Sequence, residues 1–219
     1  MAFILNIETA TKNCSVALAK DGVTVALKEY AGEGYAHAEK LHVFIEEVLQ
    51  MATVTFKDIT AVAVSMGPGS YTGLRIGVSA AKGLCYALNI PLIAVDTLEL
   101  LARKIRVESG VIIPMIDARR MEVYTAIFDK GFTKIRETKA EIVTPGFFDA
   151  IDSVIHLTGD GAAKFSEILT GDKFIYHVGA IYPSAAEMAL LSFNKYKISD
   201  TVDVAYFEPF YLKDFIAGK

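Results

Sequence analysis

The sequence lacks the features that mark secreted, membrane-spanning or metal-thiolate proteins. It has only two cysteines, Cys14 and Cys85, in apolar surroundings and without Cys-x-x-Cys spacing, so we expect buried thiols in a reducing compartment. No apolar run approaches the roughly 18 to 20 residues that cross a bilayer. Asn6 and Glu8 interrupt the first apolar stretch and no cationic segment precedes it, which is not the pattern of a secretory signal. We therefore expect a cytoplasmic protein with no membrane partner.

Positively charged residues are also fewer than negatively charged ones. Lys and Arg number 22 against 26 Asp and Glu, which gives a formal net charge of −4, and both signs are scattered along the chain. A chain that binds nucleic acid on its own usually carries a basic patch or stripe. The composition therefore argues against an autonomous nucleic-acid binder, and leaves only local basic stretches at 103–106 and 119–120 for such a role.

Apolar residues are what the sequence has in excess. They make up 53% of its 219 residues, 22% are charged, and the mean hydropathy is +0.36. A chain of this length forms one large domain or two small ones with a substantial core. The apolar excess means that more surface must be buried than an average cytosolic chain of this size presents.

The chain contains an internal repeat. An apolar β-strand pattern ends at Glu8 and is followed by a predicted hairpin whose turn contains Gly22, 14 residues later. A second apolar strand pattern ends at Asp117, and its hairpin turn contains Gly131, again 14 residues later. Each hairpin is followed by a further apolar strand that runs into a glycine-containing turn, at 67–69 and at 159–161. The long helix expected at 37–52 has only a short counterpart at 146–152.

Two halves of three antiparallel strands followed by helix–strand–helix units predict a duplicated α/β fold with mixed sheets. We expect a first lobe at 1–100 and a second at 101–219, with room for the last residues to pack back on the first lobe. In such duplications the halves face each other across a cleft. The two strand-end acids, Glu8 and Asp117, should point into it.

The composition of the loops after these acids indicates whether the cleft is suited to bind a nucleotide. Backbone amides usually approach phosphates closely only where glycine removes the side chain. The loops at 9–13 and 118–121 contain no glycine, and the second carries three large side chains. Glu8, Thr9 and Asp117 are therefore weak candidates for cofactor binding, and we favour structural hydrogen bonds as the role of the two acids.

The glycine-rich run that follows the strand at 59–65 is the most distinctive segment. It lacks the Lys-[Ser/Thr] of a P-loop and is one residue too long for the dinucleotide-binding pattern. Two interpretations remain open: an anion site at a helix N-terminus, or a tight turn into a helix capped by Ser70 or Thr72. The candidate residues of this loop are Gly67, Pro68, Gly69, Ser70, Thr72 and Gly73.

Metal and catalytic sites have little support. His37 and His42 are five residues apart, which places their rings about 140° apart on a helix with 3.6 residues per turn. We therefore interpret both as surface or interface histidines and predict no metal site. Neither cysteine precedes an obvious general base, so we predict no catalytic residue.

Two consecutive predicted helices, at 39–52 and 72–88, carry more apolar surface than packing on a sheet requires. The second has a small-residue ridge that lets another helix approach closely. Complete burial within the chain is one interpretation, and a protein partner is the one that we favour. The predicted partner-interface residues are Leu41, Phe44, Ile45, Val48, Gly73, Gly77, Ala81 and Leu84.

Several of these segments together resemble the TsaB (YeaZ) family. They are the run 67–77, which is the most specific, and the segments 4–11, 14–18, 117–119, 122–124, 159–161 and 209–212. The resemblance implies an actin-like ATPase (ASKHA) fold of two ribonuclease-H-like halves. One departure is Glu8, where relatives usually have aspartate, and this further weakens any nucleotide site.

The family resemblance also implies a function. TsaB proteins are understood as non-catalytic partners of the related subunit TsaD, and together with the ATPase TsaE they support transfer of a threonylcarbamoyl group to adenosine 3′ of the anticodon. The resemblance implies that the chain binds no cofactor alone, that ATP or ADP enters only in the complex, and that tRNA is reached indirectly. In isolation the chain can pair with itself. The alternative is a free-standing ATP-dependent enzyme or peptidase of the same fold.

Overall fold

The computed structural model describes residues 1–32 and 36–213. The chain forms two compact units. The first consists of Met1–Thr97 and Ser184–Phe210, and the second of Leu98–Pro183 with the described residues 211–213. No helix within the described ranges is long and apolar enough to cross a membrane.

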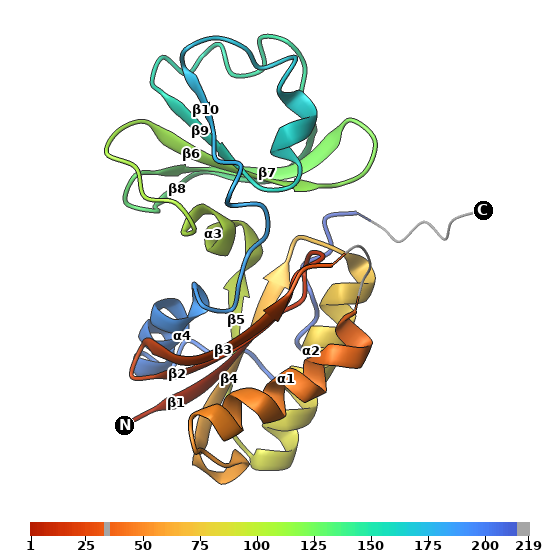
Figure 1. Cartoon of the computed structure of the whole chain (residues 1–219), viewed down its shortest axis with the longest axis vertical. Helices are drawn as coiled ribbons and strands as arrows, with labels where there is room; N and C mark the ends of the chain where they lie inside the picture. The colour runs from red at the N-terminus through yellow and green to blue at the C-terminus, as the bar shows by residue number, and fades with distance from the viewer. Residues whose placement is uncertain (33–35, 214–219) are drawn as a thin grey trace, which may run out of the picture. The chain divides into compact units, whose positions relative to one another are not determined.

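The first unit is built on a five-stranded mixed sheet with the order β3-β2-β1-β4-β5 (Figure 1). β1, β2 and β3 are antiparallel, whereas β4 and β5 continue the sheet in parallel with β1. Its strands are β1 (Phe3–Glu8), β2 (Cys14–Lys20), β3 (Val23–Tyr30), β4 (Ile59–Gly67) and β5 (Leu92–Asp96). The Asp21-Gly22 turn joins β2 to β3, as the sequence predicts, with both residues at positive φ.

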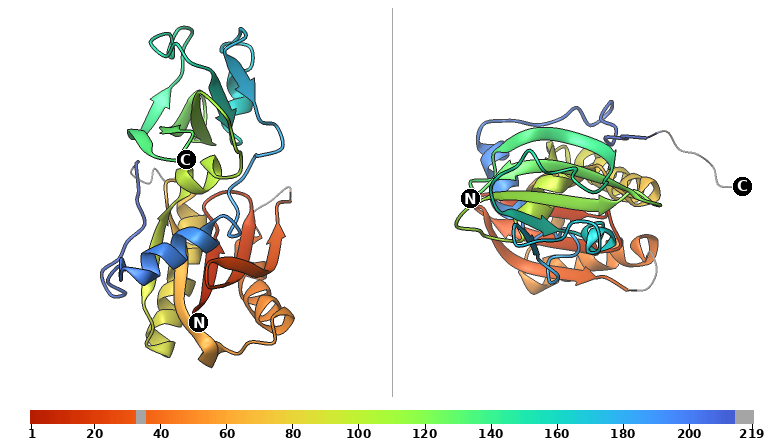
Figure 2. Two further views of the ribbon diagram at one scale, coloured as in Figure 1. Left: turned by 90° about the vertical axis from the view of Figure 1, so that its left-hand side faces the viewer. Right: turned by 90° about the horizontal axis from the view of Figure 1, so that it is seen from above.

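Helices cover both faces of this sheet because its central strands are apolar on both sides. β1 is buried at every position after Phe3. α1 (His37–Met51) and α2 (Tyr71–Leu88) lie on one face, and α4 (Met188–Lys197) lies on the other (Figures 1 and 2). The 3-10 turn η1 (Phe56–Asp58) leads into β4.

The second unit repeats the plan with the sheet order β10-β9-β6-β7-β8. Its strands are β6 (Val111–Asp117), β7 (Glu122–Asp129), β8 (Lys134–Ile142), β9 (Ile155–Thr158) and β10 (Phe174–Tyr176). The first three strands are antiparallel, and β9 and β10 run parallel to β6. The duplicated α/β architecture with mixed sheets is therefore confirmed. The unit also contains the 3-10 turn η2 (Ala162–Phe165), and α3 (Thr97–Ala102) begins at the unit boundary.

Two sequence predictions on this architecture are wrong. The segment 146–152 is a series of turns, in which the amides of Phe147, Asp149 and Ile151 each bond a carbonyl three residues earlier rather than four. The second lobe is not continuous from 101 to 219, because Ser184–Phe210 belong to the first unit; the sequence prediction allowed for such packing back of C-terminal residues but did not give its extent. Ser192 Oγ on α4 donates to Asn6 Oδ1 on β1 at 2.7 Å, which fixes this helix on the first sheet.

Candidate functional site

The glycine-rich run forms the connection from β4 into α2. Ser70 is the N-cap of α2, and its hydroxyl oxygen accepts a hydrogen bond from the amide of Gly73 at 3.3 Å. Ser70 therefore caps the helix, and Thr72, the other proposed cap, is an exposed residue of the first turn. The Gly73 amide, which a phosphate bound at this helix N-terminus would need, donates to the Ser70 hydroxyl oxygen instead.

The glycines of this run make room for the loop after β1. A Cβ atom at Gly69 would meet the carbonyl oxygen of Ala10 closer than 3.0 Å, and one at Gly73 would meet that of Thr9 equally closely. The Ser70 amide donates to Ala10 O at 2.6 Å, and Thr9 Oγ1 donates to Gly73 O at 2.8 Å. The glycine spacing therefore serves a close contact between α2 and this loop.

A second glycine contact joins the C-terminal segment to the same turn. Gly67 has φ +114°, a conformation that favours glycine, and a Cβ here would lie 2.7 Å from the carbonyl oxygen of Phe210. The amide of Phe210 donates to Met66 O at 2.7 Å, and the Gly67 amide donates to Thr97 Oγ1 at 3.0 Å. Sequence reasoning allowed the last residues to pack back on the first lobe, but it did not identify this contact because the two segments are about 140 residues apart along the chain.

Glu8 ends β1 and is completely buried. Its Oε1 accepts a hydrogen bond of 2.5 Å from the Ala10 amide, which orders the same loop. Burial raises the pKa of the Glu8 carboxyl from its ordinary 4.5 to about 7; the hydrogen bonds of Ala10 and Ser65 lower it, and the nearby charge of Glu187 raises it. At pH 7 such a carboxyl is only about half ionised, which makes it a weaker ligand for a magnesium–nucleotide complex than an ordinary carboxylate.

The corresponding acid of the second unit has different surroundings. Asp117 ends β6 and forms an ion pair with Lys164, and its Oδ1 accepts a hydrogen bond of 2.6 Å from the Arg119 amide. Arg119 and Arg120 both have positive φ, at 70° and 52°. The Asp117 carboxylate is thus used by a cation and an amide of its own unit, in agreement with the structural role that we favoured for it.

Most of the predicted partner-interface residues lie in the core of the first unit. Leu41, Ile45, Val48, Gly73, Gly77 and Ala81 are buried. The prediction that these six form a partner surface is wrong. The apolar stripe of α1 packs on the sheet, Gly73 and Gly77 of α2 pack on Thr9 of the β1–β2 loop, and Ala81 belongs to the core. Phe44 and Leu84 are only partly buried against this core.

The outer faces of the two helices still carry apolar side chains. Val43 and Met51 on α1 are 50% and 57% exposed, and Tyr86 on α2 is 85% exposed. Together with the partly buried Phe44 and Leu84 they define what we call the outer helix face. These residues lie outside the buried apolar stripes of α1 and α2, so the helical periodicity of the sequence does not predict a role for them.

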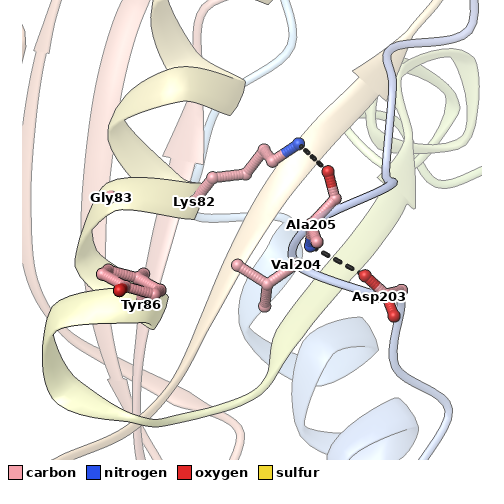
Figure 3. A pocket seen from close by; sticks show the side chains of 6 residues that line it. All are labelled: Lys82, Gly83, Tyr86, Asp203, Val204 and Ala205. Atoms are coloured by element: carbon pink, nitrogen blue, oxygen red, sulfur yellow. Dashed lines mark hydrogen bonds between the residues drawn. The ribbon is translucent and has the colours of Figure 1, made fainter.

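A shallow pocket of about 570 Å³ borders this face where α2 meets the C-terminal segment (Figure 3). Lys82 extends from α2 and donates to Ala205 O at 3.1 Å and to Phe207 O at 3.0 Å, which attaches the segment to the helix. Asp203 Oδ1 accepts from the Ala205 amide at 2.7 Å within the segment. Tyr86 and Val204 line the pocket between these contacts.

The sequence predicts no metal-binding helix, and the two histidines concerned, His37 and His42, both lie on α1. His37 is buried and its Nε2 lies 2.8 Å from Thr11 O, so its interpretation as a surface residue is wrong, whereas His42 is exposed. Burial lowers the pKa of His37. Within residues 1–32 and 36–213 no group of three or more His, Cys, Asp or Glu side chains is arranged to hold a metal.

Comparison with known proteins agrees with this architecture. The chain is 30% identical to the tRNA threonylcarbamoyladenosine biosynthesis protein TsaB of Escherichia coli (strain K12), over 99% of this chain and 96% of that protein. The chain belongs to the TsaB family. The family model for TsaD, tRNA N6-adenosine threonylcarbamoyltransferase, also matches residues 33–208.

A solved structure and a TsaD relative are also similar to this chain. A Pseudomonas aeruginosa crystal structure, described as an uncharacterized protein with similarity to peptidase YeaZ, has a TM-score of 0.82 and 25% identity, over 97% of this chain and 100% of that one. Together with the duplicated sheets, this likeness supports the actin-like fold of this TsaB chain. A tRNA N6-adenosine threonylcarbamoyltransferase of Bacillus thuringiensis (strain Al Hakam) is 36% identical over 42% of this chain and 31% of that protein. TsaB family membership places the protein in tRNA threonylcarbamoyladenosine biosynthesis.

Proposed function

We propose that this chain is a non-catalytic subunit that binds a TsaD subunit and TsaE. In that complex it is required for transfer of the threonylcarbamoyl group to adenosine 3′ of the anticodon, in tRNAs that read codons beginning with adenine. It binds no nucleotide alone, and ATP or ADP enters only with the complex. It reaches tRNA through its partners.

The proposal that the chain is non-catalytic rests on the hydrogen bonds and packing of the β1–β2 loop. The amide of Ala10 in the β1–β2 loop and the amides of Ser70 and Gly73 at the start of α2 all donate within the chain. The carbonyl oxygen of Thr9 faces Gly73 of α2, and that of Ala10 faces Gly69 in the turn before α2. Carbonyl oxygens repel phosphate oxygens, so this packing opposes a nucleotide site.

The outer helix face supports the partner-binding part. It holds apolar side chains that the core does not cover, on two adjacent helices, as a helix-mediated contact with a related fold would need. A stable complex typically buries about 800 Å² on each partner. TsaD is a fitting partner because the family model for TsaD also describes most of this chain, so both subunits would present the same two helices.

Co-elution with TsaD tests this proposal. Glutamate is introduced on the outer helix face as Val43→Glu or Tyr86→Glu, at positions that are 50% and 85% exposed, and the control is Ile135→Glu on β8, which is 58% exposed. The two former variants should lose co-elution while folding normally, and the control should keep it. Unchanged co-elution of both helix variants would reject this face as the interface.

Two further measurements separate the alternatives. Light scattering on the isolated chain shows whether the same face forms a homodimer, which the helix variants should dissociate. Calorimetry with ATP and magnesium on the isolated chain should give no binding. Micromolar binding that Asp117→Ala abolishes would instead support a free-standing ATP-dependent enzyme.

A further inference from the structure

Two histidines of the second unit lie side by side, and the proposed function uses neither of them. His156 is in β9 and His177 directly follows β10, its parallel neighbour. His156 pairs with Ile175 in the register, so His177, two residues further on, projects on the same face. Their rings are 5.2 Å apart between centroids, and Nδ1 of His156 lies 3.0 Å from Nε2 of His177.

The backbone fixes which nitrogen of His156 carries the proton. Nε2 of His156 lies 3.1 Å from the carbonyl oxygen of Ser109, which can only accept. Nε2 must therefore carry the hydrogen, and the lone pair of Nδ1 is directed at His177. A backbone carbonyl that holds the distal N–H of an imidazole is the usual second contact of a metal-binding histidine.

The distance between the two nitrogens suits a divalent transition metal. Two nitrogens bound to tetrahedral zinc at about 2.0–2.1 Å lie about 3.3 Å apart, and two cis ligands of a square-planar ion lie about 2.9 Å apart. The observed 3.0 Å lies between these values. Neutral imidazole is a preferred ligand of zinc, nickel and copper ions.

We propose that Nδ1 of His156 and Nε2 of His177 form a binding site for a late first-row divalent cation such as Zn²⁺. Across the described parts of the chain no third His, Cys, Asp or Glu completes the group, so water supplies the remaining ligands. Binding moves the proton of His177 from Nε2 to Nδ1, which leaves both rings neutral and releases no proton.

The two rings differ in exposure. His156 is 9% exposed, whereas His177 is half-buried and the next residue, Val178, is 82% exposed. Water ligands of the ion would therefore approach from the side of His177. The ion would connect β9 to the segment after β10, an edge strand of three residues. Because only the folded unit brings the two rings together, the cation would stabilise it.

Titration of the full-length chain with Zn²⁺ tests the proposal. Isothermal calorimetry should give one equivalent, and Zn²⁺ should raise the thermal midpoint. His177→Gln and His156→Gln should each weaken the binding by at least about tenfold. The matched control is His42→Gln, an exposed histidine of α1, which should bind as the unchanged chain does.

Spectroscopy locates the ion independently. Zn²⁺ should shift the imidazole nitrogen resonances of His156 and His177 and leave those of His42 in place. If His156→Gln fails to fold because it loses the Ser109 contact, the half-buried His177 keeps the test valid. Absence of binding, binding that His177→Gln leaves unchanged, or loss of binding in His42→Gln would each overturn the proposal.

Discussion

The amide nitrogen of Ser70 donates a hydrogen bond of 2.6 Å to the carbonyl oxygen of Ala10. The bond joins the start of α2 to the loop after β1, and Gly69 and Gly73 permit this approach. In the first unit, a segment that could bind phosphate is thereby used to bind another part of the chain. The first prediction, on Gly73, follows from that contact.

Replacing Gly73 by alanine should lower the free energy of unfolding by about 1–3 kcal/mol, since the new methyl group would overlap the Thr9 carbonyl, which is backbone and cannot rotate away. Urea denaturation measures the change. Gly83→Ala on the same helix is the control: no atom lies within 4 Å of a Cβ there, so helix propensity should raise stability by about 0.5–1 kcal/mol. Equal effects at both positions would contradict the packing role of Gly73.

Glu8 should make the stability depend on pH. Its pKa is raised to about 7 in the folded chain from an ordinary 4.5, so the folded state holds the proton more tightly. The resulting stabilisation is complete below about pH 4.5 and is lost as the pH rises through 7, on the order of 3 kcal/mol in total.

The control for this pH dependence is Glu8→Gln, which resembles the neutral carboxyl and cannot ionise. Urea denaturation at pH 5 and pH 8.5 should show a loss of stability in the unchanged chain and a smaller one in Glu8→Gln. Equal stability of the unchanged chain at both pH values would show that Glu8 is ionised at both. The same loss in Glu8→Gln would show that another group causes the pH dependence.

Lys82→Met should release the C-terminal segment from α2, because the lysine amine donates to two backbone carbonyls of that segment, Ala205 and Phe207. Hydrogen bonds from a charged group typically contribute about 1.5–3 kcal/mol, and the partial exposure of Lys82 places the effect at the low end. Hydrogen exchange should quicken at Phe207 and at Phe210, whose amides bond within the first unit. Lys139→Met, at an exposed position of β8, is the control and should leave these amides unchanged.

The sequence predicts the strands well because their signals are local. The apolar runs ending at Glu8 and Asp117 and the Asp21-Gly22 turn give both hairpins within a few residues. Periodicity also finds α1 and α2, but it does not say which neighbour a stripe faces. Ile45 on the stripe is therefore core, and Val43 beside it is exposed.

The sequence pattern does not predict contacts between segments that are far apart along the chain. Nothing local indicates that Ser192 bonds Asn6, so α4 was expected in the second lobe. The glycine-rich run was recognised as distinctive, and both an anion site and a tight turn were consistent with it. Only the positions of Ala10 and Phe210 show why its glycines are needed.

The most direct test of the central claim is the amount of threonylcarbamoyladenosine formed on tRNA in a reaction reconstituted from TsaD, TsaE, the threonylcarbamoyl donor and this chain. Omission of the chain, or its replacement by Val43→Glu, should abolish the product. Glu8→Gln and Asp117→Asn should support as much product as the unchanged chain, because neither acid takes part in chemistry. Loss of product with Asp117→Asn, in a complex that still assembles, would contradict a non-catalytic role.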